Sequence, residues 1–237
     1  MRYNVYSDHL KKRYGEKVYK LPISLPVTCP NRDGTCGLNG CVFCGEIGAG
    51  YENLPATMTV STQIAANKAH IGPKYKATKY IPYFQNFSNT YLPLVQLEQY
   101  LLEACQEDIV GIAIATRPDC INDRYLEMIA GVATKNNVDI SVELGLQTVN
   151  YHTLQKIQRG HGLGEFIDAV LRLKKYNIEI CTHLILNLPW DNMTDVVENA
   201  KVLSALSVNQ VKLHALYIVK GTMMADWYKQ ELFRIIS

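Results

Sequence analysis

The sequence predicts an α/β fold built on a parallel sheet, and two observations support this class. Short apolar runs alternate six times with segments in which apolar residues recur at helical spacing, and no long linker, repeat or low-complexity tract interrupts the series. The run at residues 109–115 is almost wholly apolar, as in a strand that is buried on both faces. Such a series winds into either an open barrel or a doubly wound sheet.

The strands and helices are expected to alternate, with two helical stretches after the fourth strand. The expected strands lie at residues 18–25, 80–84, 109–115, 139–144, 178–186 and 210–217. The expected helices lie at residues 62–70, 94–107, 122–134, 151–157, 164–176 and 193–206, and a last one begins at Met224. Gly72-Pro73 is expected to end the first helix, Asn122 to cap the third, and Asp191 or Asn192 to cap the sixth.

Length and composition exclude several classes of protein. With 237 residues, 48% of them hydrophobic, the chain is too long for a small metal-stapled module and can bury a core without a metal. It has no apolar run of transmembrane length and its N-terminus is charged, so we expect a cytoplasmic protein. The net charge of +2 neither requires nor excludes nucleic acid. Lysines and tyrosines interleave between Lys68 and Tyr80, which fits a nucleic-acid-binding surface or a solvated rim over packed tyrosines.

Four of the seven cysteines lie in the loop CPNRDGTCGLNGCVFCG, which begins at Cys29. Its Pro, Asn, Asp and Gly residues exclude a regular helix or strand, and the crowding fits metal binding better than disulfides. Cys41 and Cys44 form a C-x-x-C in which Phe43 would shield a metal centre, and Cys29 is the natural third ligand. Three thiolates would leave one iron of a 4Fe-4S cluster open, whereas a set completed by Cys36 would close the site, as in a structural zinc ribbon or an electron-transfer cluster.

Polar residues follow the expected strands at the ends where a parallel barrel carries its chemistry. The cysteine loop follows the first strand, Gln85 the second, residues 117–119 the third, residues 145–147 the fourth and residues 187–189 the fifth. We therefore expect these groups to meet on one rim. No G-x-G-x-x-G follows any expected strand, so a dinucleotide-binding fold has no support.

Eight motifs in order resemble those of a radical SAM enzyme. They are CPNRDGT, C-x-x-C, YFQNFSNTY, TRPD, ELGLQT, IQRGH, HLILNLP and VKLHALYIVKGT. The nearest similarity is to a group of bacterial and archaeal proteins allied to the Elongator catalytic subunit and, more distantly, to oxygen-independent coproporphyrinogen oxidase. It covers the chain from about Tyr14 to about Tyr228.

The resemblance implies a partial (β/α)6, TIM-like barrel and a 4Fe-4S cluster held by Cys29, Cys41 and Cys44. It implies that S-adenosyl-L-methionine (SAM) chelates the fourth iron, and that its reductive cleavage yields a 5'-deoxyadenosyl radical that removes hydrogen from a substrate. Most such enzymes space the cysteines C-x3-C-x2-C, whereas eleven residues separate Cys29 from Cys41 here, as in the nearest relatives. Cys36 is not a fixed cysteine in those relatives and is expected to be a spare thiol.

The expected cofactor-binding residues are Phe43, Gln85, Gln147, Arg159 and His183, and no catalytic residue is assigned beyond the cluster. The related pattern places Gln147 and Arg159 near the SAM ribose and carboxylate; the alternative for Arg159 is a surface cation at a helix end. His183 replaces an aspartate of that pattern and would donate to a ribose hydroxyl, or else be a satisfied core histidine.

Other residues depart from the related pattern or have two expected roles. Glu143 is expected to point into the barrel or to pair with Arg117. Asn187 and Trp190 replace two glycines of the relatives, and Trp190 would cover the adenine pocket. The chain is expected to be a single radical SAM core domain of residues 1–237, with residues 1–17 as an N-terminal arm and without the C-terminal segment of its relatives.

The partners are expected from the resemblance as well. Kinship with the Elongator subunit suggests that the unknown substrate is RNA, tRNA in particular, and the chemistry requires a flavodoxin- or ferredoxin-like electron donor; no membrane partner is expected. The alternative from a different class is a non-catalytic barrel in which all four loop cysteines hold zinc, acting as a nucleic-acid or protein binding module.

Overall fold

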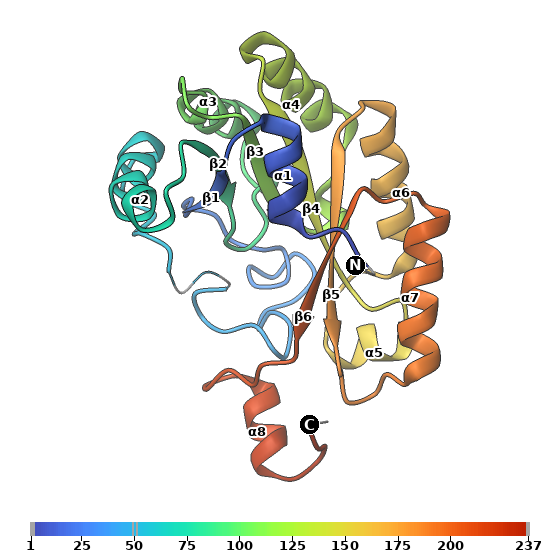
Figure 1. Cartoon of the computed structure of the whole chain (residues 1–237). Helices are drawn as coiled ribbons and strands as arrows, with labels where there is room; N and C mark the ends of the chain where they lie inside the picture. Colours follow the sequence, from blue (N-terminus) through green and yellow to red (C-terminus); the bar gives the residue numbers. More distant parts are fainter. Residues whose placement is uncertain (1–2, 49, 51, 236–237) are drawn as a thin grey trace.

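Six strands form one parallel sheet in the structure, a computed structural model that describes residues 3–48, 50 and 52–235. The strands are β1 (Val18–Ile23), β2 (Lys79–Phe84), β3 (Gly111–Thr116), β4 (Asp139–Gln147), β5 (Glu179–Leu186) and β6 (Gln210–Ala215). Each strand pairs with the next one along the chain, so the order never reverses. A doubly wound sheet requires such a reversal. The sheet instead curls into a half-barrel with β1 and β6 as its two edges (Figure 1).

Most of the helices follow strands and cover the outer face of the sheet (Figure 1). The helices are α1 (Tyr6–Tyr14), α2 (Val60–Tyr75), α3 (Leu94–Ala104), α4 (Asp123–Asn136), α5 (Tyr151–Lys156), α6 (Leu163–Lys175), α7 (Met193–Ala205) and α8 (Met223–Lys229), with a 3-10 turn η1 (Pro118–Cys120). The main core lies between sheet and helices and includes the fully buried side chains of Phe84, Ile114, Leu144, Leu97, Leu126 and Phe166. All six residues of β3 are buried, and burial on both faces explains why this strand is almost wholly apolar.

Helix α1 lies within residues 1–17, where we expected only an arm. Its buried Leu10 joins Ile81, Tyr83 and Ala113 in a small cluster on the concave side of the sheet. The helix ends at Gly15, which has a φ of +75°. With one buried leucine, this charged nine-residue segment shows little helical periodicity of apolar residues. The sequence pattern therefore does not predict the helix. It closes the concave side of the half-barrel near the N-terminal ends of the strands.

Helix α2 continues through Gly72-Pro73, which was expected to end it at His70. Pro73 removes one backbone hydrogen bond, but it lies in the last turn, and the helix ends soon after at Lys76, with a φ of +52°. Burial of Ile64 and Ile71 against the sheet outweighs that loss. Tertiary packing therefore decides the length of this helix.

Two helix caps are placed where the sequence predicted them. The side chain of Asn122 accepts a hydrogen bond from Tyr125 N at the start of α4. At the start of α7 the cap is Asn192, the second of the two candidates, whose Oδ1 lies 2.7 Å from Thr194 N. Asp191 instead accepts a hydrogen bond of 2.6 Å from the Thr153 hydroxyl.

None of the helices formed by the described residues is long and apolar enough to cross a membrane.

Candidate active site

A cavity of about 290 Å³ lies at the C-terminal ends of the strands, beneath the cysteine loop. All eight residues that the sequence predicted for the site line it: Cys29, Cys41, Phe43, Cys44, Gln85, Gln147, Arg159 and His183. They come from the loop after β1 and from or after β2, β4 and β5, and Arg159 follows α5. The expectation that strand-end groups share one rim is confirmed for the groups of the first four strands, since Arg117 and Gly145 line the cavity as well, whereas residues 187–189 after β5 do not.

Backbone contacts fix the C-x-x-C segment against the far half of the barrel. Val42 N donates to the carbonyl of Ile157 (3.1 Å), and the carbonyl of Val42 accepts from Met224 N at the start of α8 (3.0 Å). The Val42 side chain is buried in a second apolar cluster with Ile157 and Met224, and Phe43 packs against that cluster. Gly40 precedes the segment with a φ of +73°, a conformation that favours glycine. The loop therefore holds Cys41 and Cys44 on a supported backbone.

Each of the three predicted ligand sulfurs has an arginine beside it. Arg159 Nη1 lies 3.4 Å from Cys41 Sγ, and Arg32 Nη2 lies 3.4 Å from Cys44 Sγ. Arg117 Nη1 lies 3.9 Å from Cys29 Sγ.

These guanidinium groups matter because a metal binds the thiolate rather than the thiol. Burial raises the pKa of the Cys44 thiol, and the Arg32 hydrogen bond acts in the opposite direction. Guanidinium groups beside sulfur favour a charged thiolate and an anionic iron-sulfur cluster. The donor set therefore fits the cluster that the family pattern implies.

Arg117 does not pair with Glu143, and that alternative was wrong. The Arg117 side chain is almost wholly buried and binds Asp119 through two contacts, Nε–Oδ1 (2.9 Å) and Nη2–Oδ2 (2.7 Å). Burial lowers its pKa, but the hydrogen bonds and charge of Asp119 raise that pKa above its usual value. Nη1 also donates to the carbonyl of Arg159 (2.9 Å). Arg117 thus links the end of β3 to the segment that carries Arg159.

Cys36 lies outside the cavity. It is exposed, and its sulfur lies 3.7 Å from Arg117 Nη2, whereas Cys29 and Cys41 are buried. It does not line the cavity that the other three loop cysteines share. This placement agrees with the expectation of a spare thiol.

The spacing of the loop thiols bears on the kind of metal centre. A single zinc with thiolates at about 2.3 Å holds its sulfurs about 3.8 Å apart. Among the residues that the structure describes, the one group of metal-ligating atoms lying within 4.8 Å of one another is Glu143, Cys181 and His183. Among the described residues, the loop sulfurs form no such group. In a 4Fe-4S cluster each thiolate binds a different iron, so the sulfurs do not need to meet at one metal ion.

Arg159 and Gln147 meet at an irregular end of β4. The pairing of β4 with β5 shifts register between Gly145 and Gln147, and Gln147 has a φ of +78°. Arg159 Nη2 donates to the carbonyl of Gly145 (2.7 Å), and a Cβ at Gly145 would lie 2.6 Å from that nitrogen. Glycine is therefore required for the close approach. The Arg159 side chain is buried, so the alternative of a surface cation was wrong.

Four of the five residues of a hydrogen-bonded charge cluster line the inner wall of the cavity, and most of this cluster was not predicted. It consists of Lys20, Glu143, His183, Lys212 and His214, which we call the Glu143 cluster. The fully buried Glu143 carboxylate accepts from Lys20 and, at 2.6 Å, from His183 Nε2, and it lies 3.8 Å from Lys212 Nζ. The other nitrogen of His183 lies 3.2 Å from His214 Nε2. Glu143 therefore points into the barrel, as one expectation held.

The charges of the cluster explain its protonation. Burial raises the pKa of Glu143, but the His183 hydrogen bond and the Lys20 charge outweigh it and hold the pKa well below its usual range. Burial lowers the pKa of His183, and burial together with His183 and Lys212 lowers that of His214 to about 4. Both imidazoles are then neutral at pH 7, with His183 donating to the carboxylate.

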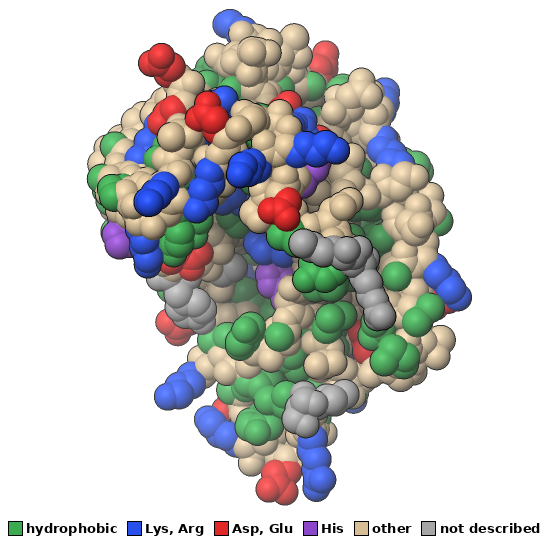
Figure 2. Space-filling view, in the orientation of Figure 1, with side chains coloured by type: hydrophobic (Ala, Val, Ile, Leu, Met, Phe, Trp, Pro, Cys, Tyr) green, Lys and Arg blue, Asp and Glu red, His purple; other side chains and the backbone are tan. Residues whose placement is uncertain are grey.

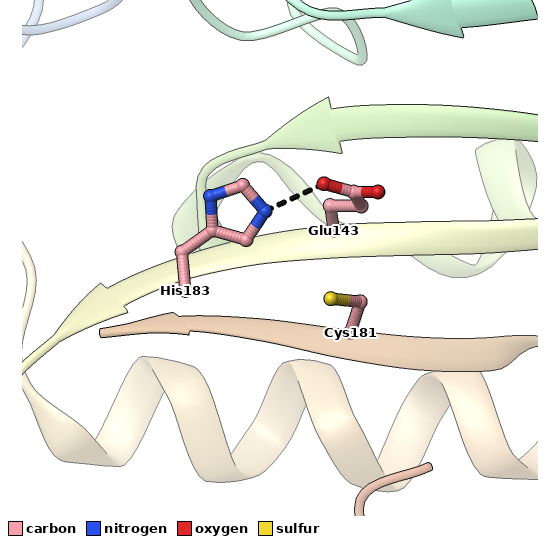
Figure 3. Close-up of side chains that lie close together, drawn as sticks. All are labelled: Glu143, Cys181 and His183. Carbon is pink, nitrogen blue, oxygen red and sulfur yellow. Dashed lines mark hydrogen bonds and ion pairs between the residues drawn. The ribbon is translucent and has the colours of Figure 1, made fainter. Parts of the chain in front are cut away.

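Figure 3 shows that Cys181 lies beside Glu143 and His183, so that sulfur, oxygen and nitrogen atoms converge. The carboxylate already accepts from Lys20 and His183, and a second ammonium group, that of Lys212, lies 3.8 Å away. These ammonium groups would repel a metal cation. Burial raises the pKa of Cys181 to about 12, so it is a thiol rather than a thiolate ligand. The group is a charge cluster and not a metal site.

One sequence signal could have revealed this cluster. Lys212 and His214 occupy alternate positions of β6, so their side chains lie on the same face of that strand. Lys20 of β1 fits the same face of the sheet. A polar face on a strand of a parallel barrel indicates a functional interior.

The two residues that replace glycines have separate structural roles. Asn187 follows β5 with a φ of +63°, a conformation that asparagine tolerates better than most residues. Trp190 packs edge-on against Trp227 and Phe233, with centroid distances of 5.8 and 5.9 Å. It does not line the cavity, so the expectation that it covers the adenine pocket is not supported.

Comparison with known proteins agrees with this geometry. Residues 31–203 match the Radical SAM superfamily. The chain is 37% identical over 237 residues to protein YtqA of Bacillus subtilis (strain 168), which covers all of this chain and 73% of YtqA. It is 24% identical over 131 residues to the tRNA uridine(34) acetyltransferase of Dehalococcoides mccartyi (strain CBDB1), covering 54% of this chain and 28% of that protein.

Two solved structures share the fold. Elp3 of Methanocaldococcus infernus superposes with a TM-score of 0.67 and 16% identity over 92% of this chain. Coproporphyrinogen III oxidase (HemN) of Escherichia coli, described as a radical SAM enzyme, gives a TM-score of 0.60 and 15% identity over 95% of this chain. The chain spans about half the length of each of these two proteins. With the half-barrel, the loop of thiols and a superfamily match over most of its length, the chain belongs to the radical SAM superfamily of enzymes.

Proposed function

We propose that Cys29, Cys41 and Cys44 hold a 4Fe-4S cluster, that SAM binds in the adjoining cavity, and that a substrate reacts there. When bound, these cofactors supply an electron and a 5'-deoxyadenosyl radical that removes hydrogen from the substrate. The chain acts as a single radical SAM core domain in this proposal. The observation that carries it is the pairing of each predicted ligand sulfur with an arginine at the edge of the cavity.

The residues around the cavity supply binding, orientation and protection from water. Phe43 lies within the C-x-x-C, packs against the apolar cluster around Val42 and lines the cavity, where it would shield the metal centre from water. Arg159 is already oriented by the carbonyl of Gly145, and its planar guanidinium suits the SAM carboxylate. Gln147 and Gln85 offer amide groups to the SAM ribose and adenine, and neutral His183 completes the inner wall. A dry cavity prevents side reactions of a radical, which is why this enclosure matters.

The match to the radical SAM superfamily and the exposed position of Cys36 outside the cavity support iron-sulfur binding over a zinc-binding module that uses all four loop cysteines. Metal analysis separates the two directly, because zinc is colourless and a cysteine-ligated 4Fe-4S cluster absorbs broadly near about 400 nm.

The substrate that we propose is RNA, tRNA in particular, with a flavodoxin- or ferredoxin-like protein as the electron donor in the cytoplasm. The similarity to tRNA uridine(34) acetyltransferases supports tRNA as the substrate. Of the interleaved Lys and Tyr residues, Tyr80 is buried in the core, and Tyr75 stacks on Tyr19 with centroids 4.5 Å apart. Lysines of this segment, rather than free tyrosine faces, would therefore contact the RNA.

The deciding experiment is anaerobic incubation of the reconstituted, dithionite-reduced protein with SAM, followed by mass spectrometry for 5'-deoxyadenosine. We expect 5'-deoxyadenosine from the wild type and from Cys36→Ala, and none from Cys44→Ala. The two variants form a matched pair, because both remove a thiol from the same loop and only Cys44 lines the cavity. A protein that holds a full cluster and forms no 5'-deoxyadenosine would refute SAM cleavage.

A further inference from the structure

A second hollow of about 480 Å³ lies along the free edge of β1, on the open side of the half-barrel. Tyr19 and Lys20 of β1 line it, together with Lys74 near the end of α2 and Lys212 of β6. It therefore bridges the two unpaired edges of the sheet. Its volume lies within the range of small-molecule sites.

Positive charge predominates in this hollow. Three lysines line it, and the carboxylate that lines it with them is Glu52. Glu143 compensates Lys20, with which it pairs, and lies farther from Lys212, at 3.8 Å. Lys74 lies over the ring of Tyr75, 5.3 Å from its centroid. Figure 2 shows further Lys and Arg side chains gathered on this face, over α1 and α2. An anion entering the hollow would meet an excess of ammonium groups.

The hollow adjoins the cofactor cavity. Tyr83, Gln85 and Lys212 line both. The ammonium groups of Lys20 and Lys212 lie 4.8 and 4.9 Å from the centroid of the Tyr83 ring. Tyr83 thus lies at the boundary between the hollow and the cofactor cavity, with two ammonium groups near its ring. A ligand anchored beside Lys212 would extend past Tyr83 toward the predicted SAM site.

We propose that this hollow binds a phosphate group of the substrate through Lys74 and Lys212, and so directs the adjoining part of the substrate past Tyr83 into the cofactor cavity. Lysine ammonium groups bind phosphate as point charges, and two of them can approach the oxygens of one phosphate from different sides. The role of this site in a reaction rests on the proposed function, but phosphate binding can be measured without turnover. RNA and a small phosphorylated substrate share this chemistry.

Pyridoxal 5'-phosphate is a suitable probe, because it carries a phosphate and its aldehyde condenses with a nearby lysine. The reconstituted protein is labelled anaerobically, quenched with borohydride and mapped by peptide mass spectrometry. We expect Lys74 and Lys212 to be labelled about tenfold faster than Lys201, an exposed lysine on α7, because positive charge concentrates the anion. Inorganic pyrophosphate is expected to protect both, and glutarate at equal ionic strength is not.

Variants and a second competitor complete the test. Lys74→Gln should slow labelling of Lys212 and weaken its protection, whereas Lys201→Gln should change neither. If a short RNA protects the two lysines from labelling at a lower concentration than pyrophosphate does, the phosphate that binds in the hollow belongs to RNA. If pyrophosphate protects at the lower concentration, it belongs to a small molecule. Equal labelling of all three lysines, or protection by neither competitor, would overturn the proposal.

Assaying 5'-deoxyadenosine in the same preparation separates the two proposals. Protection without SAM cleavage would count against the proposed function alone. Cleavage without protection would count against the phosphate site alone.

Discussion

Glu143 of β4 and His183 of β5 lie 2.6 Å apart, with the carboxylate accepting from the imidazole Nε2 inside the half-barrel. The same carboxylate accepts from Lys20 of β1, across the width of the sheet. One buried negative charge therefore organises residues from β1, β5 and β6, the last through Lys212. Since β1 and β6 do not pair through their backbones, this side-chain cluster is a direct link across the open side.

Removal of this carboxylate should be strongly destabilising. Glu143→Ala leaves the partly buried ammonium group of Lys20 without its partner, and loss of one member of a buried ion pair typically costs about 3–5 kcal/mol. The measurement is the free energy of unfolding in urea. Glu198→Ala is the control, because Glu198 pairs with Lys201 on the surface and should change stability by less than about 1 kcal/mol. Equal effects of the two changes would show that the cluster adds no stability.

Stability should depend on the protonation of His214. Its pKa is lowered to about 4 by burial and by His183 and Lys212, whereas an imidazole in the unfolded chain titrates near about 6.5. The unfolded state therefore binds more protons between these values. The stability that neutral His214 contributes to the folded state is complete above about pH 6.5 and is lost as the pH falls toward 4.

The expected size of this effect is about 1–2 kcal/mol, because His214 is half-buried and solvent screens its neighbours. Urea unfolding at pH 7 and at pH 4.5 measures it in the wild type and in His214→Asn. The variant should lose less stability on acidification. An unchanged pH dependence would mean that His214 titrates normally in the folded protein.

The iron content should separate the loop cysteines. Cys41→Ala is expected to lose most of its iron and the broad absorbance near about 400 nm after anaerobic reconstitution, because it removes a buried thiol that we propose as a ligand. Cys36→Ala should retain both, since Cys36 is exposed outside the cavity. Iron analysis per protein chain is the measurement. Retention by Cys41→Ala with loss by Cys36→Ala would refute the ligand assignment.

Arg159 should tune the redox potential of the cluster. Arg159→Lys cannot keep both the Gly145 carbonyl and the Cys41 sulfur as hydrogen-bond acceptors. Loss of a hydrogen bond worth about 1 kcal/mol corresponds to about 40 mV for one electron, and the potential should become more negative. Redox titration followed by electron paramagnetic resonance measures the change. Arg172→Lys, on the surface of α6, should leave the potential unaltered.

The backbone at Asn187 offers a test of strand-end geometry. Its φ of +63° costs a β-branched residue about 1–2 kcal/mol, so Asn187→Val should destabilise the fold by that amount. Asn187→Gly should be close to neutral, because glycine adopts this conformation freely. Urea unfolding compares the two variants. A larger loss for glycine than for valine would mean that the Asn187 side chain, rather than its backbone, is important.

Much of the fold could be predicted because its signals are local. Alternating apolar runs and helical patterns located every strand and every helix after β1, and side-chain caps such as Asn122 marked their starts. The errors occurred where packing outweighed local preference. Helix α1 is stabilised by burial of Leu10 on the concave side, and α2 passes Pro73 because its apolar face is buried.

The sequence by itself determined the kind of chemistry: the spacing of Cys29, Cys41 and Cys44, and polar residues at strand ends, are properties of neighbouring positions in the chain. The tertiary structure alone decided which side chains meet. It paired Arg117 with Asp119 rather than Glu143, and it brought β6 side chains beside the Glu143 carboxylate. Which side chains meet depends on how the sheet curls. The curl is the sum of small twists over many residues, so no short sequence motif can predict it.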